Sequence, residues 1–300
     1  MILALRALGV GDLATAVPAL RGLRGAFPGR PLALAAPAWL TPLIELTGAV
    51  DKIIPTGGLG EGLRTDEAPE VAVNLHGSGP ESHRLLQTTQ PAKLWAFASP
   101  NAGHLDGPPW IEEEHEVHRW CRLLRHYGVP ADEADLSLAV PGVDVPAGVT
   151  IIHPGAKSPS RRWPAERFAA VASALADQGH RVVITGSESE RALGERVAEL
   201  AGRPAVLRTG LAELAGLVAR ARLLISGDTG IAHLASAYGT PSVVLFGPMS
   251  PSRWGPPARP YHRVLWHGTR SERGDSPDPG VHPALLEVTP AEVLDAAAAF

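Results

Sequence analysis

Three segments of the chain carry residues whose types and spacing suit phosphate binding or the activation of a hydroxyl. The first is Gly9 to Ala14, the second runs from His153 to Phe168, and the third from Ser226 to Pro248. Each directly follows a short apolar run and precedes a helical pattern. Glycines and exposed N–H groups at such a strand-to-helix turn let an anion approach the backbone. The three segments therefore predict a site for a phosphorylated ligand.

The first segment, GVGDLA, formally satisfies the dinucleotide-binding fingerprint GxGxxA. That fingerprint requires an acid for the ribose at the end of the next strand, but this strand ends Ala35-Ala36-Pro37, which disfavours NAD or FAD. Asp12 then has two interpretations. It is either a carboxylate that caps the helix start or a general base that accepts a proton from a hydroxyl.

The second segment places Lys157, Arg161 and Arg162 between a strand and a helix N-terminus. Cationic side chains there add to the backbone N–H groups and the helix dipole, an arrangement that suits a diphosphate. The alternative is a solvated basic loop. We expect Trp163-Pro164 to fix this loop against the following helix.

The third segment reads as a complete strand-turn-helix-turn-strand unit. Asp228 or Thr229 is expected to cap its helix, and Gly230 permits the close approach of a ligand. His233, one turn in, is suited to donate to a phosphate, although a lone helix histidine also has a structural interpretation. Glu188, after another predicted strand, is by itself only a surface acid.

Metal signatures are missing from the sequence. It contains no P-loop, no HExxH and no strict DxD motif, and we interpret Asp132 to Asp135 as a surface turn. We therefore expect no metal, and we expect basic side chains and helix dipoles to neutralise a departing diphosphate.

The elements that must position these loops alternate between short strands and helices, which is typical of an α/β fold with parallel sheets. The predicted strands cover residues 2–8, 32–36, 52–55, 71–75, 92–97, 149–153, 181–185, 205–208, 223–226 and 242–246. The chain from 247 to 289 is interpreted as irregular, before a last helix at 290–299. Two doubly wound domains follow, at 1–145 and 149–285, with Val140 to Gly148 as the linker candidate between them.

Composition excludes several classes of protein. The chain has 300 residues, is 45% hydrophobic and carries a net charge of −4, which excludes a disordered chain. It shows no basic stripe with interleaved aromatics, no apolar run long enough to span a membrane and no N-terminal leader. We accordingly expect no nucleic-acid partner and no integral membrane segment. The single cysteine, Cys121, gives no sign of an oxidising compartment, so the expected location is cytoplasmic.

Together the motifs resemble those of glycosyltransferase family 9, the ADP-heptose heptosyltransferases. The shared features, in order, are a GD loop followed by Pro18-Ala19-Leu20, an HPG loop that ends in Arg161-Arg162-Trp163-Pro164, and the Asp228 to Pro248 unit. The His115 to Arg119 stretch also looks like the helix that precedes the family's linker. The resemblance implies a GT-B fold, in which two Rossmann-like domains face each other across a cleft. Residues 1–145 would then bind the acceptor and residues 149–285 the nucleotide-sugar donor, with a hinge at the linker. The segment 286–300 is expected to pack back on the first domain.

The resemblance also implies roles for individual residues. Asp12 is expected to deprotonate the acceptor hydroxyl, which then attacks the anomeric carbon with inversion. The expected donor contacts are Lys157, Arg161, Arg162, Glu188 (to the ribose), Asp228, Thr229, Gly230 and His233. ADP-heptose would be the co-substrate, with no separate cofactor.

The acceptor is expected to be a sugar or polyol that is not strongly anionic. Family members that build lipopolysaccharide act on phosphorylated cores, whereas residues 1–149 hold 11 Lys and Arg against 17 Asp and Glu, a net charge of −6. The acceptor-side candidates are Gly11, Asn74, His76, Ser78 and His83. The acids of Glu112 to Glu116 are a hypothetical contact for a cationic acceptor. Two alternatives remain open: a GT-B nucleotide-sugar epimerase and a non-catalytic nucleotide-binding protein.

Overall fold

The computed structural model describes residues 1–202, 205–269 and 280–300, and these residues form two compact units. Unit 1 comprises Met1–Ala139 and unit 2 comprises Val140–Phe300. The boundary falls at the first residue of the segment predicted as a hinge. Across the described residues, no helix has the length and apolar character that crossing a membrane requires.

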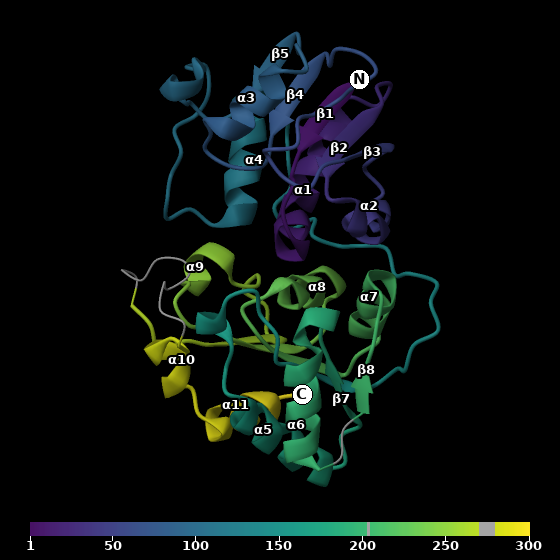
Figure 1. Ribbon diagram of the computed structural model, residues 1–300, viewed down its shortest axis with the longest axis vertical. Coiled ribbons are helices and arrows are strands. Elements are labelled where there is room, and N and C mark those ends of the chain that lie inside the picture. The colour runs from purple at the N-terminus through teal and green to yellow at the C-terminus, as the bar shows by residue number, and fades with distance from the viewer. Residues whose placement is uncertain (203–204, 270–279) are drawn as a thin grey trace. The chain divides into compact units, whose positions relative to one another are not determined.

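Unit 1 is built on a parallel sheet of five strands in the order β3-β2-β1-β4-β5 (Figure 1). Its strands are β1 (Ile2–Leu5), β2 (Leu32–Ala36), β3 (Lys52–Pro55), β4 (Val71–Asn74) and β5 (Lys93–Trp95). Its helices are α1 (Val10–Ala26), η1 (Ala38–Leu40), α2 (Thr41–Leu46), α3 (Glu81–Gln87), η2 (Pro100–Ala102) and α4 (Glu116–His126). Because β1 lies in the centre of the sheet, the loop that follows it also lies at the centre of the carboxyl edge.

Unit 2 repeats this architecture with six parallel strands in the order β11-β10-β9-β6-β7-β8. Its strands are β6 (Thr150–His153), β7 (Val182–Thr185), β8 (Ala205–Leu207), β9 (Leu223–Gly227), β10 (Ser242–Leu245) and β11 (His262–Leu265). Its helices are η3 (Pro159–Arg161), α5 (Ala165–Asp177), η4 (Glu188–Glu190), α6 (Arg191–Ala201), α7 (Leu211–Ala219), α8 (Gly230–Tyr238), α9 (Pro251–Trp254), α10 (Pro283–Glu287) and α11 (Pro290–Ala297). Figure 1 shows α5, α6 and α11 on one side of this sheet and α7 and α8 on the other, as in a doubly wound domain.

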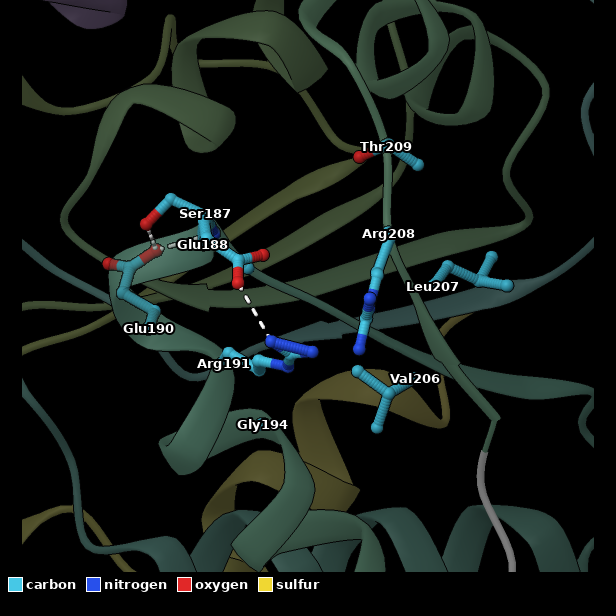
Figure 2. Close-up of a pocket in the computed structure, with 10 residues that line it drawn as sticks. Ser187, Glu188, Glu190, Arg191, Gly194, Val206, Leu207, Arg208 and Thr209 are labelled. Carbon is cyan, nitrogen blue, oxygen red and sulfur yellow. Dashed lines mark hydrogen bonds and ion pairs between the residues drawn. The ribbon is translucent and has the colours of Figure 1, made fainter.

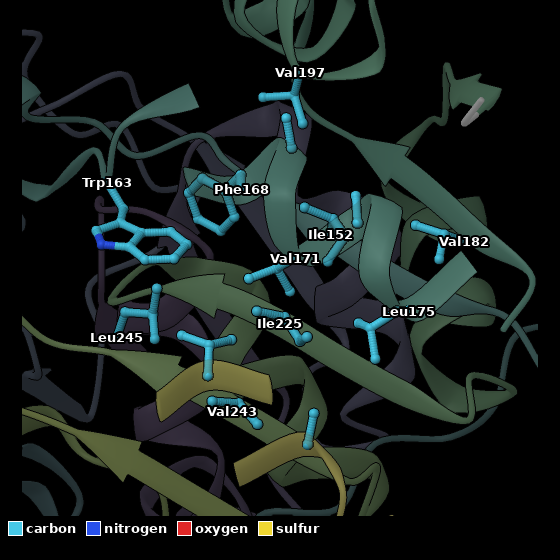
Figure 3. Close-up of a cluster of buried hydrophobic side chains, with 14 of the residues drawn as sticks. Ile152, Trp163, Phe168, Val171, Leu175, Val182, Val197, Ile225, Val243 and Leu245 are labelled. Atoms are coloured by element: carbon cyan, nitrogen blue, oxygen red, sulfur yellow. The ribbon is translucent and has the colours of Figure 1, made fainter. Parts of the chain in front are cut away.

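The core of unit 2 explains why its strands are continuous apolar runs. Ile152, Ile225 and Val243 come from three neighbouring strands and pack against Phe168 and Leu175 of α5 (Figure 3). Helices cover both faces of a parallel sheet. A polar side chain on either face of a strand would therefore be buried away from water, which favours continuous apolar runs. Such burial contributes about 25 cal/mol per Å² of apolar surface.

The structure corrects two expectations for the C-terminal part of the chain. The region after Phe246 was expected to be irregular, but it contains strand β11, paired in parallel with β10 from Ser242↔His262 to Leu245↔Leu265. The last helix, α11, was expected to pack on the first domain. Instead its Val293 and Ala297 lie in the hydrophobic core of unit 2, and the helix packs on α5 and β10.

Candidate functional site

Asp12 lies in the first turn of α1, directly after the central strand β1. Its Oδ2 accepts a hydrogen bond from the Gly9 N–H at 3.0 Å, and its Oδ1 lies 3.4 Å from Nη2 of Arg6. The side chain keeps 28% of its surface exposed. The two interpretations of Asp12 are therefore compatible, since the carboxylate caps the helix start and still reaches solvent. Gly11 lies beside it in the same turn and is half-buried.

His76 belongs to the loop after β4, the strand that pairs with β1 so that Leu5 faces Asn74. Its Nδ1 accepts a hydrogen bond from the Ala7 N–H at 3.2 Å, which leaves the proton of the neutral ring on Nε2. Burial lowers the pKa of His76 to about 4, helped by the positive charge of Arg6 and opposed by Asp12. His76 is thus a neutral, half-buried N–H donor at the same sheet edge as Asp12.

Two other acceptor-side candidates do not present their polar groups to a ligand. Asn74 and His83 are fully buried. The Asn74 amide donates to Gly77 O and to Nδ1 of His83, and Nε2 of His83 lies 2.8 Å from Phe97 O, to which it donates. Burial also lowers the pKa of His83. These two side chains support the loop from inside, which corrects their expected contact with the acceptor, whereas Ser78 in that loop is half-buried.

Only two of the four acids of 112–116, Glu112 and Glu113, are exposed as the hypothesis of a cationic acceptor requires. Glu114 and Glu116 are buried, and each is paired with arginines of α4, Glu114 with Arg122 and Glu116 with Arg119. A buried carboxylate requires such a partner because the loss of hydration is costly. Their charge is therefore balanced inside unit 1.

In unit 2, the loop after β6 has the three expected cations in three different environments. Arg161 pairs with Asp228 at 3.1 Å, Arg162 donates from Nε to Ala156 O at 2.8 Å, and Lys157 is exposed. Trp163 is buried and donates from Nε1 to Val288 O at 3.0 Å, with Phe168 packed edge-on to its ring. The prediction that Trp163 fixes this loop is confirmed.

The start of this loop packs against Glu190, a residue that the sequence analysis did not single out. A Cβ on Gly155 would lie 2.2 Å from the Glu190 carboxylate, so a larger residue there would have to displace this side chain. The carboxylate also accepts from Ser187 and faces His153, which bonds Thr185 through Nδ1. Burial lowers the pKa of His153, whereas the partners of Glu190 hold its pKa low despite burial. Its signal in the sequence was the Ser-x-x-Glu capping box.

The third segment forms the turn from β9 into α8, as predicted. Thr229 occupies the N-cap position without a side-chain capping bond, and Gly230 is the first helical residue. The Asp228 carboxylate is 5% exposed and pairs with Arg161. His233 lies one turn into α8 and packs edge-on against Trp254 at 5.9 Å between ring centroids. The pairing neutralises Asp228, which would otherwise repel an anion at this helix start.

A pocket lies at the carboxyl ends of β7 and β8 and contains Glu188 (Figure 2). The exposed Glu188 carboxylate pairs with Arg191 at 2.8 Å, while Arg208 and Thr209 line the β8 side. The pocket shares its sheet edge with the loops after β6 and β9. Unit 2 thus combines a pocket with two strand-to-helix turns suited to phosphate. Among the described residues, no group of three or more His, Cys, Asp or Glu is placed to hold a metal ion.

Solved structures of two heptosyltransferases show that the chain has the GT-B fold. The structure of Escherichia coli ADP-heptose lipopolysaccharide heptosyltransferase II is 23% identical, with a TM-score of 0.80 over 99% of this chain and 97% of that chain. The structure of E. coli heptosyltransferase WaaC with ADP is 18% identical, with a TM-score of 0.75 over 98% of both chains.

Sequence comparison identifies the family. The model for glycosyltransferase family 9 (heptosyltransferase) matches residues 108–275, and the chain belongs to this family. Lipopolysaccharide heptosyltransferase 2 of E. coli is 26% identical over 95% of this chain and 94% of its own length. Lipooligosaccharide heptosyltransferase 2 of Haemophilus influenzae is 31% identical over 47% of this chain and 44% of its own.

Proposed function

We propose that this glycosyltransferase transfers a heptose from ADP-heptose to a hydroxyl of a sugar or polyol acceptor that is not strongly anionic, with inversion and without a metal ion. The observation that carries the proposal is the Asp12 carboxylate, which is oriented by Gly9 and Arg6 and remains accessible at the carboxyl edge of the unit 1 sheet. A carboxylate so placed suits the removal of a hydroxyl proton.

In the proposed reaction, the acceptor hydroxyl loses its proton to Asp12 while its oxygen forms a bond to the anomeric carbon. The bond from that carbon to the diphosphate breaks on the opposite face, and its electron pair leaves with ADP. His76, a neutral donor at the same edge, is suited to orient the acceptor. Inversion follows from attack opposite the leaving group.

Unit 2 supplies the groups proposed to bind the donor. The exposed Lys157, the Arg161 guanidinium and the start of α8 are suited to the diphosphate. Glu188, in the pocket at the ends of β7 and β8, is suited to accept hydrogen bonds from ribose hydroxyls. Stabilising the charge of the departing diphosphate is expected to be the larger contribution, since removing one preorganised donor in other enzymes costs about 10²–10³-fold in rate.

The proposed acceptor charge is supported by the ion pairs of unit 1. Eight of its eleven Lys and Arg side chains pair with acids of the same unit: Arg6, Arg21, Arg24, Arg30, Lys52, Arg119, Arg122 and Arg125. Few cations of unit 1 are therefore left without an acidic partner to bind a phosphorylated acceptor. The proposed acceptor is neutral at the reacting end.

The test combines donor binding, turnover and product stereochemistry. ADP should stabilise the protein by about 2.7 kcal/mol at 100 times its Kd, while UDP, GDP and NAD should not. Asp12→Asn should lose at least 10²-fold in kcat and keep its affinity for ADP. The matched control is Asp135→Asn, an acid paired with Arg21 away from the β1 loop, which should keep full activity. NMR of the product should show an inverted anomeric centre.

Different failures would overturn different parts. Full activity in Asp12→Asn would remove Asp12 as the base. Conversion of the sugar nucleotide without any acceptor would favour an epimerase, and nucleotide binding without turnover on any acceptor would favour a binding protein. Stabilisation by UDP or GDP alone would exclude ADP-heptose as the donor.

A further inference from the structure

Arg6 is one of two fully buried cations of unit 1, with 1% of its surface exposed, as for Arg119. It follows β1 directly and lies between the sheet and α1. A guanidinium in this position has lost its hydration, so its N–H groups need protein partners. The structure provides them. Nη1 donates to Leu75 O at 2.5 Å, and the face of Trp120 lies 4.6 Å from the guanidinium carbon.

Three of the remaining contacts converge on one turn of α1. Nε of Arg6 donates to the backbone oxygen of Asp12 at 2.9 Å, and Nη2 lies 3.4 Å from Oδ1 of the same residue. Nη2 also donates to Oγ1 of Thr15 at 3.3 Å, and this hydroxyl in turn donates to Asp12 O at 3.0 Å. Arg6 therefore holds both the backbone and the carboxylate of Asp12.

Arg6 is itself held by a second carboxylate. Oε2 of Glu116 lies 3.5 Å from Nη2 of Arg6 and accepts a hydrogen bond from Nε1 of Trp120 at 3.0 Å, while its Oε1 pairs with Arg119. Glu116 is buried and comes from α4, the helix that packs against α1. Arg6 thus lies between the buried carboxylate of Glu116 and the partly exposed carboxylate of Asp12. The position of the Asp12 carboxylate therefore depends on how Glu116 holds Arg6.

We propose that Arg6 is a positioning residue for Asp12, fixing its carboxylate at the edge of the sheet, and that Glu116 anchors Arg6 from α4. The inference rests on the proposed function, because it assigns Arg6 a role that is exerted through Asp12. Oδ2 is fixed by Gly9 and Oδ1 by Arg6, so the carboxylate has one orientation towards the acceptor side. Misplacement of a catalytic group by about 1 Å costs about 10²-fold in rate.

The experiment is a double-mutant cycle between Arg6→Gln and Asp12→Asn, with kcat and the KM for the donor measured for each variant. We expect Arg6→Gln to lower kcat at least 10-fold and to change the donor KM less than 2-fold. In the Asp12→Asn background the same substitution should cost less than 2-fold, because the group that it positions is no longer a base. Arg6→Lys should recover part of the kcat, since an ammonium keeps the charge but lacks the guanidinium fork.

The matched control is Arg21→Gln, on the same helix α1. Arg21 donates to Thr47 O and pairs with Asp135, so its loss should lower the unfolding temperature and leave kcat unchanged. If Arg6→Gln does not fold, the cycle is run with Arg6→Lys, for which we expect a several-fold loss of kcat that disappears in the Asp12→Asn background.

Two results separate the inference from the function on which it rests. If Asp12→Asn retains full activity, the proposed base is wrong. The inference is overturned if Asp12→Asn is impaired and Arg6→Gln lowers kcat by the same factor in the Asp12→Asn background as in the wild type. It is also overturned if folded Arg6→Gln has a normal kcat. In either case Arg6 does not act through Asp12.

Discussion

The guanidinium of Arg161 lies 3.1 Å from the carboxylate of Asp228, a residue 67 positions further along the chain. This pair connects the loop after β6 to the start of α8, the two turns of unit 2 that are suited to a diphosphate. An acid at a helix start that binds anions would oppose binding by its charge. Pairing with Arg161 removes that opposition and holds the arginine in place.

Arg161→Ala should therefore weaken ADP binding and also destabilise the protein. The substitution removes a cation from the diphosphate site and leaves the buried Asp228 carboxylate without its arginine counter-charge. We expect the Kd for ADP to rise at least 10-fold and the stability to fall by about 2 kcal/mol. Adding Asp228→Asn to Arg161→Ala should restore part of both losses, because the buried negative charge is then removed as well. Titration calorimetry and thermal unfolding measure the two effects. If the free-energy losses of Arg161→Ala and Asp228→Asn simply add in the double variant, the two residues do not act as a pair.

Removing metal ions should leave the transferase rate unchanged. In the proposed reaction, Lys157, Arg161 and the start of α8 neutralise the departing diphosphate. We expect initial rates in excess EDTA to match those with added Mg²⁺ within 2-fold. Lys157→Ala should raise the donor KM about 5-fold at low salt, and less at high salt because the side chain is exposed. The control is Arg196→Ala, an exposed cation of α6 that pairs with Glu199. A rate that EDTA abolishes and Mg²⁺ restores would disprove the metal-independent reaction.

Glu188→Gln should affect recognition of the ribose and little else. A hydrogen bond from a hydroxyl to a carboxylate is worth about 1.5–3 kcal/mol, so its loss predicts a Kd for ADP that is about 10-fold higher or more. Deoxyribose analogues of ADP, which lack the hydroxyl concerned, should bind wild type and variant equally. Glu195→Gln is a close control, because Glu195 also pairs with Arg191, at 3.2 Å, but does not line the pocket. If Glu188→Gln weakens the binding of ADP and of its deoxy analogues equally, Glu188 does not contact the ribose hydroxyl.

Much of the fold could be predicted because buried parallel strands have a strong sequence signal. The predicted limits 32–36 and 52–55 coincide with β2 and β3, and most other strands differ by one or two residues. Strand β11 was missed because its sequence, His262-Arg263-Val264-Leu265, is short and half polar, and it lies in a Pro-rich region. Pairing with β10, which the sequence does not display, makes it a strand.

For the candidate site, the sequence predicted which loops gather but not the partners of their side chains. The sequence offered Asn74 and His83 as hydrogen-bonding groups for the acceptor. In the structure both are buried, and the His83 ring bonds Phe97 O. In the sequence, Arg6 is only a charged residue within the apolar run of residues 2–8. Its contacts with Leu75 and Glu116 arise from tertiary packing, which residue types and spacing do not encode.

Acidification between pH 7 and pH 5 should destabilise the protein through its buried histidines. Burial lowers the pKa of His76 and of His262 to about 4, whereas in the unfolded chain a histidine titrates near 6.5. Between these values the unfolded state binds more protons, so stability falls as the pH falls from about 6.5 towards 4 and is constant above about 7. Allowing for partial exposure, we expect a loss of about 1 kcal/mol per histidine at pH 5.

Unfolding in denaturant as a function of pH measures this effect, and the histidine window can be separated from that of the carboxylates. Acids with lowered pKa, such as Asp51 and Glu133, contribute mainly below about pH 4.5. His262→Gln removes a ring that bonds Ser242 inside unit 2, and should flatten the curve between pH 7 and pH 5. His126→Gln, at an exposed position of α4, should leave the slope unchanged. A wild-type stability that does not vary between pH 7 and pH 5 would mean that these imidazoles keep their ordinary pKa values in the folded protein.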